Sequence, residues 1–264
     1  MQNRSLARFL AGATGLLFLL ATGCGSLQSN AANGVGTALS GNWAFIPATN
    51  NAVSLNLGFT QGAYETVSAV ARLNGVSCVG SSTNIQLTGS VNGSNQMTLI
   101  SSPFSGTILT LKGAVAVNGS AIGNATWSFT GGSCASLGTA SVNATNYSTI
   151  GGTFTGNFLD GSGNQLPVSA FLQQTTQPDS NGQFSLSGTA SFPTNTCFVQ
   201  QPALTSSLVT GSNLSMTYTD PAGGAVLTAT GTFNSAATQL TIANWTIAGG
   251  ACDGDSGTGS LTEQ

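Results

Sequence analysis

The segment TWSFTGGSCASLGTASV at residues 126–142 recurs in altered form as NWTIAGGACDGDSGTGSL at residues 244–261. In both segments a Trp stands seven residues before a Cys, and a Gly-Gly pair lies between them. The two Trp residues, Trp127 and Trp245, are 118 positions apart, and the two Cys residues have the same offset. A repeat at one long offset indicates that the chain contains two copies of one domain.

Shorter matches at a similar offset extend the repeat towards the N-terminus. The tripeptide Gly-Asn-Trp at residues 41–43 corresponds to Gly-Asn-Phe at residues 156–158. We therefore expect the first copy at residues 40–147 and the second at residues 151–264.

The cysteines follow the same repeat. Of the five cysteines, Cys24 precedes both copies, and the other four lie 56 and 55 residues apart within their copies. This duplicated spacing predicts two disulfides, Cys78–Cys134 and Cys197–Cys252, one inside each copy. A zinc site is the alternative, but it would need thiolates from two domains and lacks the close Cys-x-x-Cys pairs of such sites.

Each copy has the pattern of an all-β domain. Runs such as TILTL at residues 107–111 and SLSGT at residues 185–189 alternate with a period of two. Asn-Gly pairs such as Asn92-Gly93 separate the runs and favour tight hairpins. We expect two tandem antiparallel β domains of about eight strands each.

The predicted disulfides bear on how these strands are arranged. In an up-and-down meander, the connection between strands three and four emerges at the same end as the one between strands seven and eight. Each predicted disulfide joins these two connections, which favours a meander barrel, with a two-sheet sandwich as the alternative. A single 16-stranded membrane barrel would need girdles of aromatic residues, whereas Trp and Tyr together number only six.

The N-terminus has the features of a bacterial export signal. Arg4 and Arg8 precede an apolar run at residues 9–20, and Leu-Ala-Thr-Gly-Cys follows at residues 20–24. This order resembles the lipobox of bacterial lipoproteins, with Ala21 where Leu is usual.

The lipobox resemblance implies a signal peptide at residues 1–23 and a diacylglycerol and palmitate anchor on Cys24. Residues 24–39 are then a flexible tether. Gly25 follows the Cys, and in the Gram-negative sorting pattern that this resembles, a residue other than Asp at that position favours the outer membrane. We expect a lipid-anchored protein of the cell envelope, with the membrane as its partner.

The charge balance excludes several functions. Without residues 1–23, two bases remain against seven acids, a net charge of −5. A basic patch for nucleic acid is therefore absent from the sequence. The chain has no His, which excludes Ser-His-Asp and Cys-His catalysis. No cofactor is expected.

Acidic residues are the remaining candidates for chemistry. Asp160, Asp179 and Asp220 lie in turn sequences, where Asp normally bonds its own backbone. Asp253 and Asp255 are weak metal candidates, because Asp-x-Asp-x-Gly resembles the start of a calcium loop. The first copy has Ala-Ser-Leu-Gly at the matching place, and a tight turn beside the disulfide is the simpler interpretation.

These observations leave three functional hypotheses. The first is a non-enzymatic binding or structural role in the envelope. The second follows from Gly41-x-Trp43, which resembles the Gly-x-Trp signature of lipocalins and implies a barrel that carries a small apolar ligand; Phe158 replaces the Trp in the second copy. The third is a module that binds or cleaves carbohydrate, such as an envelope glycan; cleavage needs two acids roughly 5–10 Å apart. We expect that the protein is not an enzyme.

Overall fold

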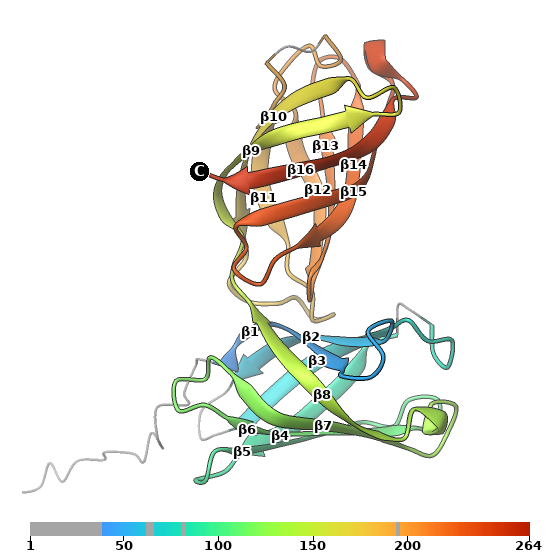
Figure 1. Cartoon of the computed structure of the whole chain (residues 1–264), viewed down its shortest axis with the longest axis vertical. Coiled ribbons are helices and arrows are strands. Elements are labelled where there is room, and N and C mark those ends of the chain that lie inside the picture. Colours follow the sequence, from blue (N-terminus) through green and yellow to red (C-terminus); the bar gives the residue numbers. More distant parts are fainter. Residues whose placement is uncertain (1–38, 62–65, 81–82, 194–195) are drawn as a thin grey trace, which may run out of the picture.

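The computed structural model describes residues 39–61, 66–80, 83–193 and 196–264. Within these residues the chain forms two closed eight-stranded barrels, one after the other along the sequence (Figure 1). Each strand pairs antiparallel with its neighbours in sequence, and the last strand of each barrel pairs with the first. The prediction of two antiparallel β domains is therefore confirmed, with meander barrels rather than sandwiches.

Each barrel has the eight strands that the sequence predicted. The first barrel comprises β1 (Gly41–Pro47), β2 (Ser54–Gln61), β3 (Thr66–Asn74), β4 (Ile85–Val91), β5 (Gln96–Ser101), β6 (Ile108–Val115), β7 (Ile122–Thr130) and β8 (Thr139–Tyr147). The second comprises β9 (Gly151–Asp160), β10 (Gln165–Gln174), β11 (Leu186–Ser191), β12 (Ala203–Thr210), β13 (Asn213–Thr219), β14 (Val226–Phe233), β15 (Gln239–Ala248) and β16 (Ser256–Glu263).

Buried and exposed side chains alternate along the strands and so form the two cores. In β6, Leu109 and Leu111 are fully buried, while the next residue, Lys112, is exposed to solvent. Because successive side chains of a strand point to opposite faces, one face fills the barrel and the other meets water. Each barrel thus has its own hydrophobic core.

Aromatic side chains occupy both interiors. In the first barrel the rings of Trp43 and Phe59 meet edge to face, with centroids 6.0 Å apart. In the second, Phe158 stacks on Trp245 at 5.6 Å. All four side chains are at most 2% exposed, so the Gly-x-Trp position of the first copy is part of the core.

A disulfide closes one end of each barrel. Cys78 bonds to Cys134 and Cys197 bonds to Cys252. Each bond links the connection between the third and fourth strands of its barrel to the connection between the seventh and eighth. This confirms the pairing that the duplicated spacing predicted.

The two barrels meet at a packed junction, which lies between the two bodies in Figure 1. Asn42 in β1 is 2% exposed. Its Oδ1 accepts a hydrogen bond from the Gly211 nitrogen at 2.7 Å, and its Nδ2 donates to the Gly211 oxygen at 2.7 Å. Asn56 in β2 adds a bond from Nδ2 to the Thr210 oxygen at 3.3 Å. The turn between β12 and β13 is therefore bound to the first barrel through its backbone.

Close backbone contacts complete the junction. Asn84 Nδ2 donates to Asn181 Oδ1 at 2.6 Å. A Cβ at Gly182 would lie 2.3 Å from the Val70 oxygen, and one at Gly58 would lie 2.7 Å from the Gly182 oxygen. The barrels approach so closely here that only glycine fits, which gives the pair one fixed orientation.

The predictions for the N-terminus, including the signal peptide and Cys24, lie outside the described residues. Among the residues that are described, no helix is long and apolar enough to cross a membrane.

Candidate functional site

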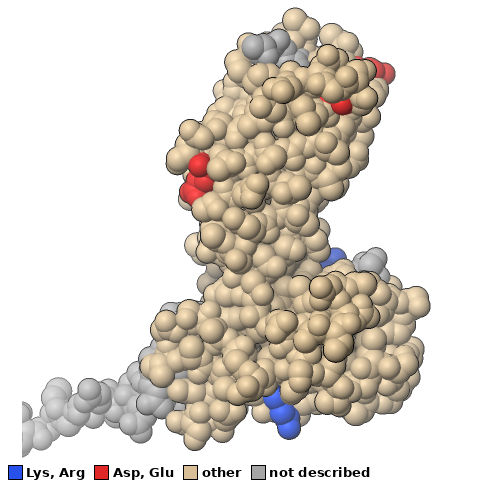
Figure 2. Space-filling model, viewed as in Figure 1, with Lys and Arg blue, Asp and Glu red and all other residues tan. Residues whose placement is uncertain are grey.

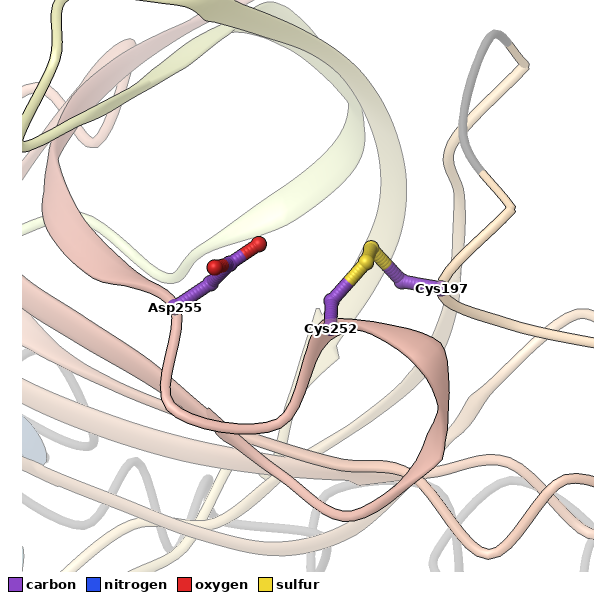
Figure 3. A group of neighbouring side chains, drawn as sticks. All are labelled: Cys197, Cys252 and Asp255. Carbon is purple, nitrogen blue, oxygen red and sulfur yellow. A yellow bond between two sulfur atoms is a disulfide. The ribbon is translucent and has the colours of Figure 1, made fainter.

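The acidic groove of the second barrel brings together several residues considered in the sequence. It encloses about 250 Å³ beside the disulfide, and Asp160, Asp255 and Trp245 line it. Asp160 ends β9 and Asp255 directly precedes β16, and these two strands are paired, which places both acids at one end of the barrel. Figure 3 shows the Asp255 side chain beside the Cys197–Cys252 bond.

Asp160 organises the turn between β9 and β10. Its Oδ1 accepts hydrogen bonds from the nitrogens of Ser162 and Asn164, at 2.9 and 2.7 Å, and its Oδ2 accepts one from Asn164 Nδ2 at 2.7 Å. Hydrogen bonds from the Asn164 side chain and backbone hold the pKa of Asp160 below its usual value. Asp160 thus has the turn role that the sequence predicted.

The two calcium candidates differ in their surroundings. Asp253 is exposed, and its Oδ1 accepts a hydrogen bond from the Gly249 nitrogen at 2.7 Å, which closes the turn after β15. A carboxylate oxygen of Asp255 and the sulfurs of Cys197 and Cys252 lie within 4.8 Å of one another. Calcium prefers oxygen ligands, and sulfurs joined in a disulfide are not thiolates. This arrangement therefore favours a turn over a metal site.

Sugar hydrolysis would require one acid of this groove to act as a general acid. A general acid needs a raised pKa to remain protonated near neutral pH. The lowered pKa of Asp160 keeps it ionised instead. Its two carboxylate oxygens are also occupied by the turn. Asp160 is therefore poorly suited to act as the general acid.

Asp220 has a structural role that its turn sequence did not reveal. Its side chain is 1% exposed. Oδ2 accepts a hydrogen bond from the Val199 nitrogen at 2.6 Å, and Oδ1 accepts bonds from the nitrogens of Ala222 and Gln200, at 2.9 and 3.3 Å. It thereby fastens the loop that follows Cys197 to the turn between β13 and β14. An Asp that caps only its own turn has the same sequence signature.

The surroundings of Asp220 affect its ionisation in two directions. Burial alone would raise its pKa, but hydrogen bonds from four backbone nitrogens outweigh burial and lower the pKa below 3.8. The folded state therefore favours the ionised carboxylate. This contribution to stability is present above about pH 4 and is lost as the pH falls through the folded-state pKa.

We expect Asp220→Asn to destabilise the second barrel at pH 7, because an amide cannot accept the same set of hydrogen bonds. The difference from wild type should shrink as the pH falls below about 4 towards the lowered folded-state pKa of Asp220. Urea unfolding from pH 3 to pH 7 measures this. Asp253→Asn is the control, since Asp253 is exposed and accepts a single hydrogen bond among the described residues, from the Gly249 nitrogen. Equal losses of stability for the two variants at pH 7 would contradict the assigned role.

Charge is sparse over the surface and divided between the barrels. The two bases that follow residue 23, Arg72 and Lys112, are in the first barrel, while six of the seven acids are in the second. Figure 2 shows a face that is almost entirely uncharged. A partner would therefore meet mostly hydroxyl, amide and apolar groups.

No protein-family model, curated protein or solved structure matches the chain.

Proposed function

We propose that the protein is a lipid-anchored component of the bacterial cell envelope, with a binding or structural role that involves no catalysis. The lipid on Cys24 would fix it to the outer membrane of a Gram-negative cell. Residues 24–39 would connect that anchor to the two barrels.

The observation that carries this proposal is the disulfide within each barrel. Disulfides persist in oxidising compartments such as the periplasm and the cell surface, and they are rare in the cytosol. Both barrels have one at the same place in the fold. Together with the lipobox resemblance, this supports export.

The sparse charge supports a tethered rather than a freely diffusing protein. Only 4% of residues are charged, so solubility depends on Ser, Thr, Asn and Gln, which suits a protein fixed to a membrane better than one in a crowded cytosol. The few ionisable side chains also leave little for acid-base chemistry, which supports a role without catalysis.

A lipocalin-like carrier is the second candidate, because both domains are closed eight-stranded meanders. A carrier needs space inside the barrel for its ligand. Here the buried rings of Trp43, Phe45 and Phe59 contact one another in the first barrel. We therefore place the binding or structural role first.

The anchor is tested by Cys24→Ala in a Gram-negative host. We expect the wild-type protein to incorporate labelled palmitate and to sediment with membranes. The variant should incorporate none and should retain its signal peptide, because the acceptor sulfur for the lipid is gone.

A second substitution tests the sorting signal. Gly25→Asp should leave palmitate incorporation unchanged while moving the protein from the outer to the inner membrane, since Asp after the lipidated Cys resembles the signal for retention in the inner membrane.

For the first test, equal palmitate labelling of wild type and Cys24→Ala would overturn the anchor.

A further inference from the structure

The groove at the barrel junction encloses about 410 Å³, within the range of roughly 300–1,000 Å³ of small-molecule sites. The first barrel contributes the start of β1, Ser120, and the end of β8 with the residues after it. The second contributes Gln174, Thr176 and Phe184. Domain interfaces are a preferred place for ligand sites.

The lining of the junction groove contains no charged side chain. Its side chains are mainly hydroxyls and amides, together with the aromatic rings of Tyr147 and Phe184. An edge-to-face contact with Phe233, at 5.3 Å between centroids, fixes the Tyr147 ring. Hydroxyl and amide groups beside an aromatic ring match a ligand that has many hydroxyls, apolar C–H faces and no charge.

Gln174 is a nearly buried polar side chain in the lining of the groove. It is 5% exposed, and its Oε1 accepts a hydrogen bond from the Ile150 nitrogen at 3.2 Å. This bond fixes which end of the amide is the oxygen. Nε2 has no hydrogen-bond partner among the described residues, although it belongs to a side chain more than nine-tenths buried. Gln174 lines the groove, so its amide nitrogen, held in one orientation, can donate a hydrogen bond to a ligand there.

Other lining groups are also available to a ligand. The side chains of Asn146, Tyr147 and Thr176 make no hydrogen bond with other described residues. Asn146 is on the first barrel and Thr176 on the second. The Asn42–Gly211 bonds join the two barrels beside the groove.

We propose that the junction groove binds a neutral saccharide, with Gln174 and the free hydroxyl and amide groups contacting its hydroxyls and Tyr147 contacting a sugar face. The proposal rests on the proposed function, because it specifies what the envelope protein binds. A phosphate-bearing or carboxylate-bearing ligand would find no cation in this lining, and an apolar ligand would leave its polar groups unpaired.

The test uses the full-length protein, extracted in a detergent without a sugar headgroup. Binding is measured by saturation-transfer NMR and titration against neutral oligosaccharides of hexoses and N-acetylhexosamines, with uronic-acid oligosaccharides and fatty acids as competing classes. We expect binding of one or more neutral members only.

One variant from each wall then locates the site. Asn146→Ala and Thr176→Val should each weaken binding about three- to tenfold, as expected for the loss of one hydrogen bond. Asn143→Ala is the matched control, because Asn143 is exposed on the same strand outside the groove, and it should bind as wild type does. Unchanged melting temperatures show that the variants are folded.

Two outcomes overturn the inference: no binding of any neutral oligosaccharide, or binding that both wall variants leave unchanged. In either case palmitate labelling of Cys24 could still succeed, and the proposed function would stand without this ligand. Failure of the labelling alongside saccharide binding would instead overturn the anchor and leave the groove assignment intact.

Discussion

Replacing Cys78 and Cys134 together by alanine is expected to lower the free energy of unfolding of the first barrel by about 4 kcal/mol. The disulfide closes a loop over a sequence separation of 56 residues, and cross-linking a loop of this length restricts the unfolded chain by about that amount in the chain-entropy treatment. Cys134 is also fully buried, so its truncation adds the cost of a small cavity. Urea unfolding under oxidising conditions measures the change.

The second barrel provides the matched control for this experiment. Cys197→Ala with Cys252→Ala removes the equivalent disulfide, over a separation of 55 residues. It should destabilise the second barrel by a similar amount and leave the intrinsic stability of the first unchanged. Losses below about 1 kcal/mol for both double variants would show that the disulfides do not support the barrels.

Gly182→Ala is expected to disrupt the junction between the barrels. The added Cβ would lie 2.3 Å from the Val70 oxygen and 2.8 Å from the Val70 Cβ, across the interface. Relief of this clash requires the barrels to separate or the backbone to shift, at about 1–3 kcal/mol by analogy with overpacked cores. Small-angle X-ray scattering should show a larger maximum dimension, and urea unfolding should show reduced stability.

Gly163→Ala separates the clash from backbone strain. Gly163 and Gly182 both have positive φ, at 83° and 71°, so alanine is strained at either position. However, a Cβ at Gly163 would meet no atom within 4 Å. The Gly163 variant should therefore keep the scattering profile of the wild type. The same profile for both variants would contradict a tightly packed junction.

Local and periodic features made the barrels predictable. The period-two alternation located the strands, and the duplicated Cys spacing selected one pairing among the three that four cysteines allow. Asp160 could be assigned to its turn because the groups it bonds lie within four residues. Each of these signals is contained in a short stretch of chain or in a repeat.

The junction and its groove could not be predicted in the same way. Asn42 and Gly211 are 169 positions apart, and in a chain so rich in Asn and Gly nothing marks either one. Asp220 bonds its own turn through the Ala222 nitrogen, as its sequence predicted, but its further bonds to the loop after Cys197 were not predictable. Contacts of this kind depend on how folded strands, turns and loops pack against one another, which neither strand periodicity nor turn chemistry encodes.

The most direct test of the lipid-anchored, disulfide-bonded protein is the intact mass of the chain recovered from the membranes of a Gram-negative host. We predict a chain that begins at Cys24, carries a diacylglyceryl group, and lacks four hydrogens because of its two disulfides. A chain without lipid, a different first residue, or four free thiols in Cys78, Cys134, Cys197 and Cys252 would contradict it.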